Sequence, residues 1–223
     1  FAPTVYPLQW NKGDGCIYFN TNDEDCRNIY RYSPQTKKFE KLNLETDVTS
    51  AFALSENNPS IAAYIGQSNH NAGVAYLYDM KKKTSRLLAD PMKPILDEIE
   101  LGKTEPWNFT ASDGTTIQGM MCLPPNFDPN KKYPLIVYYY GGTTPTERGI
   151  SNPYCAQLFA SRDYVVYVIN PSGTIGYGQE FSARHVNAWG KRTADDIIEG
   201  TKQFCKEQPF GNDKKRGCLG ASY

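Results

Sequence analysis

The sequence predicts a mixed fold, in which an all-β N-terminal part precedes an α/β part built on a parallel sheet. Two observations predict it. Residues 1–90 repeat at a shift of 46 positions, which brings Tyr18 onto Tyr64 and Tyr30 onto Tyr76. After the repeats, nearly continuous apolar runs alternate with helical patterns, as in a sheet that is covered on both faces.

Each repeat is predicted to form four short strands separated by turn-rich clusters. The expected strands are residues 4–10, 16–22, 27–33 and 39–44 in the first repeat, and 50–54, 61–67, 74–79 and 85–89 in the second. Four strands in every 40 to 50 residues are typical of β-propeller blades. Two blades cannot close a propeller, so we expect residues 1–92 to be the last blades of an incomplete one. The paired Tyr residues of these strands are expected to pack between blades.

A proline-marked linker is expected at residues 93–104, and an α/β domain at 105–223. Its expected strands are residues 108–111, 116–123, 133–140, 164–170 and 215–220, and its expected helices are 156–161 and 193–208. Thr193, with Asp196 three residues later, predicts the start of the second helix. Its apolar stripe is predicted to comprise Ile197, Ile198, Thr201, Phe204 and Cys205.

The chain ends in Gly220-Ala221-Ser222-Tyr223. A Gly-x-Ser-x sequence after a short strand is most of the nucleophile elbow of α/β-hydrolases, so residues 105–223 are predicted to be the N-terminal half of such a catalytic domain. Serine needs a base to become a nucleophile, and in this fold the acid and the histidine follow the serine in sequence. We therefore expect this chain to be a fragment that is inactive by itself.

Four motifs in order carry a family resemblance. They are Tyr140-Gly141-Gly142, the glycine-rich stretch 170–178, Trp189-Gly190 before an acidic helix start, and Gly220-Ala221-Ser222-Tyr223. Together they resemble the prolyl oligopeptidase family of serine peptidases, especially its dipeptidyl peptidase IV-like branch. The sequence departs from the family at Thr143, where proline is common, and at residues 170–172, where Asn-Pro-Ser replaces the more usual Asp-x-Arg.

The resemblance implies a serine peptidase that hydrolyses short peptides by acyl-enzyme chemistry, as a dipeptidyl- or oligopeptidase that cleaves after Pro or Ala. Ser222 would be the nucleophile, and the fold makes the backbone N–H of Tyr223 an oxyanion donor. By resemblance, the hydroxyl of Tyr140 is the second donor, a role that a shift of one or two positions would move to Tyr139 or Tyr138. A homodimer of the parent protein is compatible with the family, and a periplasmic or secreted location is slightly favoured over a cytoplasmic one.

Two alternatives remain open at this point. A small-ester esterase would share the elbow, although simple esterases do not carry propeller blades. A non-catalytic interaction protein on a hydrolase scaffold would not need the Gly-x-Ser-Tyr motif.

Composition excludes other classes of function. With 24 basic and 24 acidic residues the net charge is zero, which argues against nucleic acid as a partner. We expect no membrane span, because the chain has no apolar run of about 18 residues. We expect no metal or cofactor, because six Cys form no Cys-x-x-Cys pair and only two His are present. His185 precedes Ser222 in the sequence, which is the wrong order for a triad base. Cys16 and Cys26 flank a predicted hairpin turn, so they either form a disulfide or are buried as free thiols.

Overall fold

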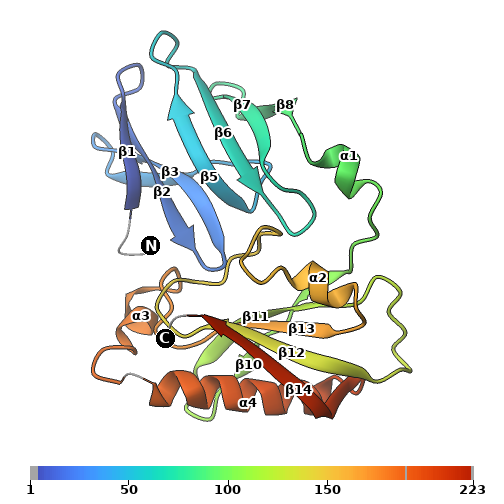
Figure 1. Ribbon diagram of the computed structural model, residues 1–223. Coiled ribbons are helices and arrows are strands. Elements are labelled where there is room, and N and C mark those ends of the chain that lie inside the picture. The colour runs from blue at the N-terminus through green and yellow to red at the C-terminus, as the bar shows by residue number, and fades with distance from the viewer. Residues whose placement is uncertain (1–4, 189, 222–223) are drawn as a thin grey trace. The chain divides into compact units, whose positions relative to one another are not determined.

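The computed structural model describes residues 5–188 and 190–221. The chain divides into two compact units (Figure 1). The first comprises Phe1–Ile99 with Glu147–Ser151, and the second comprises Glu100–Thr146 with Asn152–Tyr223.

The first unit is built on one eight-stranded sheet with the order β1-β2-β3-β5-β6-β7-β8, and β4 pairs with β3. The strands are β1 (Val5–Asn11), β2 (Cys16–Asp23), β3 (Cys26–Ser33), β4 (Lys38–Lys41), β5 (Val48–Leu54), β6 (Ile61–Gln67), β7 (Val74–Asp79) and β8 (Thr84–Ala89). All neighbours are antiparallel except β3 and β5, which meet at the single parallel pair Arg27 and Val48. All eight strands predicted from the repeats are present, whereas the propeller architecture stays a prediction.

Aromatic rings explain why the two repeats share a pattern. Tyr18 and Tyr64 are only 1% and 2% exposed and occupy equivalent positions in the core of this sheet. Tyr64 stacks on Tyr76 of the neighbouring strand with ring centroids 5.0 Å apart, and Tyr30 stacks on Phe19 in the same way at 6.0 Å. These rings are therefore partnered across strands of their own sheet.

The pairing of β2 with β3 excludes the disulfide considered above. Asp23 faces Cys26 beside the turn, and Ile17 faces Tyr32 at the far end of the hairpin. Cys16 and Cys26 consequently lie at opposite ends of the two strands, and both are free thiols. Burial raises the pKa of Cys26 to about 12, and it also raises the pKa of Cys16.

The second unit is built on a six-stranded sheet with the order β10-β11-β13-β12-β14, and β9 pairs with β11. The strands are β9 (Thr104–Pro106), β10 (Phe109–Thr110), β11 (Thr116–Cys122), β12 (Tyr133–Tyr140), β13 (Val165–Asn170) and β14 (Gly211–Ala221). The central strand β12 is parallel to both β13 and β14, whereas β11 is antiparallel to β13. The predicted parallel sheet is therefore present, with an antiparallel extension.

Helices cover both faces of this second sheet (Figure 1). Helix α2 (Ala156–Ala160) packs on one face, where Ala160 joins Tyr138 and Val166 in a buried cluster. Helix α4 (Lys191–Glu207) packs on the other, where Phe204 is fully buried against Trp107 and Tyr167. Every residue of β13 is buried, as expected for a doubly covered strand.

Helix α4 corrects two details of the sequence prediction. It begins at Lys191 after Gly190, whose φ is +85°, so Thr193 lies within the helix instead of capping it. The Thr193 hydroxyl instead donates to the carbonyl oxygen of Ser172 at 3.4 Å. Ile198, predicted for the apolar stripe, is 49% exposed, whereas Gly200 and Asp196 are buried.

Three short elements were not predicted: α1 (Lys93–Leu96), α3 (Gln179–Ala183) and β9. Two of them, α1 and β9, involve residues of the expected linker. None of the helices within residues 5–188 and 190–221 combines the length and the apolar character needed to cross a membrane.

Candidate active site

Of the three predicted catalytic residues, Ser222 and Tyr223 lie outside the described residues, and Tyr140 lies inside them. Tyr140 is the last residue of β12 and pairs in parallel register with Ala221, the residue that precedes Ser222 in sequence. The carboxyl ends of β12 and β14 therefore meet at one edge of the sheet. Ligand sites of parallel α/β sheets lie outside such an edge.

The three consecutive tyrosines of β12 have different surroundings, because side chains alternate between the two faces of a strand. Tyr138 is 5% exposed and packs edge-on against Tyr154, with ring centroids 5.4 Å apart. The ring of Tyr139 lies against Gly220 of β14, and burial beside the Cys218 thiol raises the pKa of Tyr139. Tyr140 is half-buried at the end of the strand.

Gly142 accommodates the ring of Tyr140. A Cβ atom at position 142 would lie 2.6 Å from Cε1 and 2.9 Å from Cζ of Tyr140, closer than real Cβ contacts come. The phenol therefore folds back over the backbone of Gly142. The Tyr140-Gly141-Gly142 motif is visible in the sequence, but the contact of the ring with Gly142 is not.

The loop that follows Gly142 is fastened to the next strand and its loop. Thr146 donates its N–H to Oδ1 of Asn170 at 2.8 Å, and Nδ2 of Asn170 donates to the carbonyl oxygen of Thr146 at 3.2 Å. The N–H of Ile175 donates to the carbonyl oxygen of Thr143 at 2.8 Å. Asn170 is 4% exposed and also donates to the hydroxyl of Tyr177 at 2.9 Å.

The glycine-rich stretch forms the tight turns that the sequence predicts. Gly173, Gly176 and Gly178 all have φ between +97° and +99°, a region that favours glycine. Gly173 also packs against His185, whose Cβ would lie 2.6 Å from a Cβ at position 173. His185 is buried at 8% exposure, in keeping with a structural role, and His70 is exposed in its turn as expected.

Ser172 ties this stretch to α4 and to the segment after α3. Its N–H donates to Oδ2 of Asp196 at 2.7 Å, and Nε of Arg184 donates to its hydroxyl at 3.0 Å. Burial raises the pKa of Asp196, and the bonds from Ser172 oppose that rise. Asp196, expected to mark the helix start, lies within α4 as a buried acceptor at 4% exposure.

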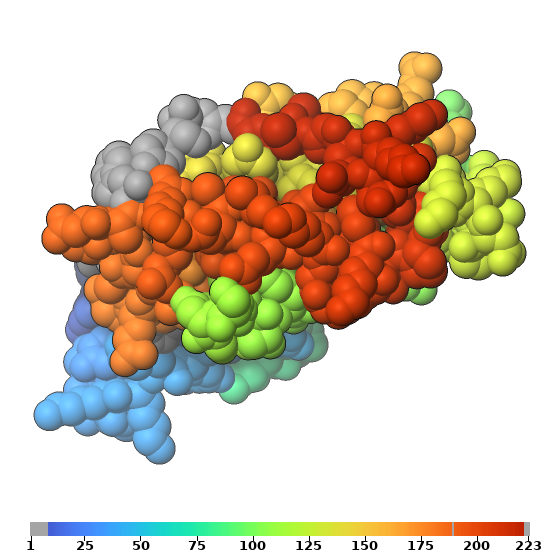
Figure 2. All heavy atoms as spheres, turned by 90° about the horizontal axis from the view of Figure 1, so that it is seen from below, coloured from blue at the N-terminus to red at the C-terminus, as the bar shows by residue number. Residues whose placement is uncertain are grey.

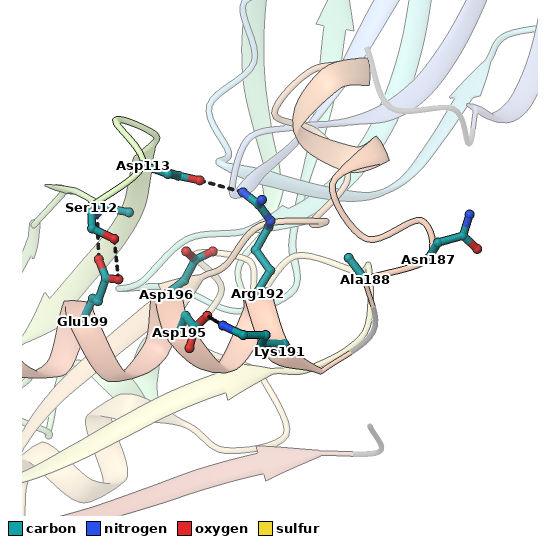
Figure 3. Close-up of a pocket in the computed structure, with 10 residues that line it drawn as sticks. Ser112, Asp113, Asn187, Ala188, Lys191, Arg192, Asp195, Asp196 and Glu199 are labelled. Carbon is teal, nitrogen blue, oxygen red and sulfur yellow. Dashed lines mark hydrogen bonds and ion pairs between the residues drawn. The ribbon is translucent and has the colours of Figure 1, made fainter.

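A pocket of about 590 Å³ lies beside the first turns of α4 (Figure 3). Four of its charged side chains form two ion pairs: Arg192 with Asp113 at 2.6 Å, and Lys191 with Asp195 at 2.6 Å. Glu199 accepts hydrogen bonds from the N–H and the hydroxyl of Ser112, both at 2.8 Å. Figure 2 shows the turn that carries Ser112, in green, against the side of α4.

Hydrogen bonds from Thr115, together with Arg184, hold the pKa of Asp113 well below its usual range. These pairs therefore fasten the turn between β10 and β11 to α4. Among the residues that the structure describes, no group of three or more His, Cys, Asp and Glu side chains could hold a metal ion.

Comparisons with known proteins bear on this edge of the second sheet. Residues 151–223, which include β13, α4 and β14, match the model of the prolyl oligopeptidase family. The resemblance to the prolyl oligopeptidase family is confirmed.

Relatives of this chain include dipeptidyl peptidases. Dipeptidyl-peptidase 5 of Porphyromonas gingivalis is 26% identical over 224 residues, which cover 100% of this chain and 32% of that protein. A probable dipeptidyl-peptidase 5 of Aspergillus terreus is 36% identical over 110 residues, which cover 49% of this chain and 15% of that protein. The chain thus spans no more than about a third of the curated relatives it matches.

Solved structures share the fold of this chain. The acylaminoacyl peptidase of Pyrococcus horikoshii superposes with a TM-score of 0.85 at 22% identity, covering 100% of this chain and 34% of that one. Dipeptidyl peptidase 4 of Porphyromonas gingivalis gives a TM-score of 0.79 at 20% identity, covering 97% of this chain and 31% of that one. At these identities, the likeness extends to the fold alone.

Proposed function

We propose that the protein containing this chain is a serine peptidase that hydrolyses short peptides through an acyl-enzyme, removing dipeptides or short oligopeptides after Pro or Ala. The family match over residues 151–223 and the names of the relatives support it. In this proposal the first unit supplies the last blades of a β-propeller that screens substrates by size. The second unit supplies the N-terminal half of an α/β-hydrolase domain.

The observation that carries the proposal is the pairing of Tyr140 with Ala221 at the carboxyl edge of the second sheet. A nucleophile elbow requires its serine at the carboxyl end of a central parallel strand. In this sequence Ser222 directly follows Ala221, which ends β14. The predicted oxyanion donor and the predicted nucleophile thus belong to adjacent parallel strands.

The proposed reaction assigns one role to each of these residues. The hydroxyl oxygen of Ser222 attacks the peptide carbonyl, and a histidine base from beyond Tyr223 takes its proton. The carbonyl oxygen becomes an oxyanion, which accepts hydrogen bonds from the Tyr140 hydroxyl and the Tyr223 N–H. The leaving amine departs with the proton held by the histidine, and water then hydrolyses the acyl-enzyme. Without the downstream acid and base, the chain by itself would be inactive.

Substrate comparison in the full-length protein tests this proposal. We expect dipeptidyl nitroanilides with Pro or Ala in the second position to be cleaved with a far higher kcat/KM than a short-chain nitrophenyl ester. Ser222→Ala should abolish both reactions, whereas Ser161→Ala, in the turn after α2, should leave them unchanged. Preferential ester hydrolysis would favour the esterase alternative, and equal activity of wild type and Ser222→Ala would refute the proposal.

A further inference from the structure

We propose that Asn170 is a positioning residue for the oxyanion hole, acting on Tyr140 through the loop that follows β12. This inference rests on the proposed function, because it assigns Asn170 a part in that reaction. Asn170 is the last residue of β13, and Tyr139 pairs with Ile169 in the parallel register of β12 and β13. Tyr140 and Asn170 therefore end adjacent strands at the same edge of the sheet.

The side chain of Asn170 holds both polar backbone groups of one residue. Its Oδ1 accepts the Thr146 N–H at 2.8 Å, and its Nδ2 donates to the Thr146 carbonyl oxygen at 3.2 Å. Both residues are buried, at 4% and 6% exposure. A primary amide is suited to this task, because it carries a donor and an acceptor on one rigid plane. A carboxylate could accept the N–H but would repel the carbonyl oxygen.

The two Asn170–Thr146 hydrogen bonds, here called the clamp, lie a short distance along the chain from Tyr140, the proposed oxyanion donor. The loop from Gly141 to Thr146 leaves the end of β12 and includes Gly142, over which the Tyr140 phenol folds. The N–H of Ile175 also tethers this loop, because it donates to the carbonyl oxygen of Thr143. If Asn170 releases Thr146, the loop gains freedom and the backbone of Gly142 no longer fixes the ring. A donor displaced by about 1 Å loses roughly 100-fold in rate.

The second bond from Nδ2, to the Tyr177 hydroxyl at 2.9 Å, brings the glycine-rich turn into the same unit. Asn170 thus links the loop after β12 with the turn after β13. Nothing in the described contacts requires Asn170 to touch substrate, so we assign it positioning and not catalysis.

The chain contains a matched control for this clamp. Gln157 in α2 accepts the Gly102 N–H at 2.7 Å and donates to the Gly102 carbonyl oxygen at 2.9 Å. It is buried at 7% exposure, so Gln157→Ala removes the same pair of bonds from a similarly buried site. The residues it fastens are not part of the loop that carries Gly142. General destabilisation should therefore be comparable, apart from the third bond, to the Tyr177 hydroxyl, that only Asn170→Ala removes.

The test compares Asn170→Ala, Asn170→Asp and Gln157→Ala in the full-length protein, with alanyl-prolyl nitroanilide as substrate and concentrations corrected for the folded fraction. We expect Asn170→Ala to lower kcat roughly 10- to 100-fold while KM changes less than about 3-fold. Asn170→Asp keeps an acceptor for the Thr146 N–H but repels the Thr146 carbonyl oxygen, so its kcat should fall at least as far as that of Asn170→Ala. Gln157→Ala should keep kcat within about 2-fold.

A double-mutant cycle separates positioning from a merely structural effect. If Asn170 acts through Tyr140, adding Asn170→Ala to Tyr140→Phe should lower kcat by less than about 3-fold, because the hydroxyl it positions is already gone. Full additivity, or unchanged kcat in Asn170→Ala, would overturn the inference.

Hydrogen exchange separates this inference from the proposed function. The amide of Thr146 should exchange faster in Asn170→Ala than in Gln157→Ala, and this readout needs no turnover. If Asn170→Ala speeds Thr146 exchange but the wild-type protein has no peptidase activity, the Asn170–Thr146 hydrogen bonds matter for the loop and the proposed function fails. An active wild type whose Thr146 exchange is unaffected by Asn170→Ala would refute the clamp alone.

Discussion

The position of the Tyr140 ring depends on a single neighbouring residue, Gly142. Tyr140 is the last residue of β12, and its ring occupies the space that a side chain at position 142 would fill. In an oxyanion hole the donor must already point at the developing charge, because reorientation during the reaction would cost part of its benefit. A rigid aromatic ring held against backbone satisfies that requirement.

Removing the Tyr140 hydroxyl should therefore affect turnover more than binding. In the full-length protein we expect Tyr140→Phe to lower kcat about 100- to 1,000-fold, or roughly 3–4 kcal/mol, with little change in KM. Tyr138→Phe is the control, because Tyr138 is a core residue on the same strand. Equal steady-state kcat values for Tyr140→Phe and wild type would show that Tyr140 is not an oxyanion donor.

Turnover should also depend on the absence of a side chain at Gly142, where the Tyr140 ring lies. Gly142→Ala places a methyl group 2.6 Å from the ring of Tyr140, so the ring must move. We expect kcat to fall at least 10-fold while the melting temperature changes by only a few degrees. Gly217→Ala on β14 is the control, since a Cβ there meets no atom within 4 Å. A Gly142→Ala enzyme with wild-type kcat would show that the ring position is irrelevant to the reaction.

At the scale of elements, α4 combines an apolar face with one buried carboxylate. Asp196 accepts the Ser172 N–H at 2.7 Å, which fixes the turn after β13 to the helix. Asp196→Ala should cost about 1–3 kcal/mol of unfolding free energy, because it leaves that N–H buried without its acceptor. Denaturant titration of the variant against wild type measures the loss.

The same residue predicts a dependence of stability on pH. Burial raises the pKa of folded Asp196 above the ordinary value of 3.8. The protonated carboxyl of Asp196 therefore stabilises the folded state fully below pH 4. This stabilisation is lost as the pH rises from there through the folded pKa, because the buried carboxyl group must then ionise. Asp196→Asn keeps an acceptor oxygen without the charge, so its stability relative to wild type should increase across that rise. A relative decrease would contradict the sign.

Strands were easier to predict than helix ends and short elements. Period-two alternation and continuous apolar runs located β2, β6, β7 and β12 to within a residue. The start of α4 was wrong because the Thr193 hydroxyl bonds to Ser172, a distant segment, instead of to its own helix. Helix α3 has only five residues, too few for a periodic signal. The sequence places Asn170 in the glycine-rich motif and as a departure from the family pattern, but its contact with Thr146 depends on strand order and is not predictable from the motif.

At the scale of the whole molecule, the proposed active site needs residues outside this chain. His70 is exposed in the first unit, and His185 is buried against Gly173. We therefore expect the full-length variant His70→Gln/His185→Gln to keep kcat within a few-fold of wild type, measured per titrated active site. A loss of 1,000-fold or more would mean that one of these two histidines is the base, and the downstream assignment would be wrong.

We propose that Ser222 is the nucleophile of a serine peptidase, and all the other assigned roles depend on it. The most direct test is to treat the full-length protein with a fluorophosphonate and to map the adduct by mass spectrometry of its peptides. We expect one adduct, on Ser222, that disappears in Ser222→Ala and forms more slowly in Tyr140→Phe. An unlabelled protein, or an adduct on a different residue, would contradict it.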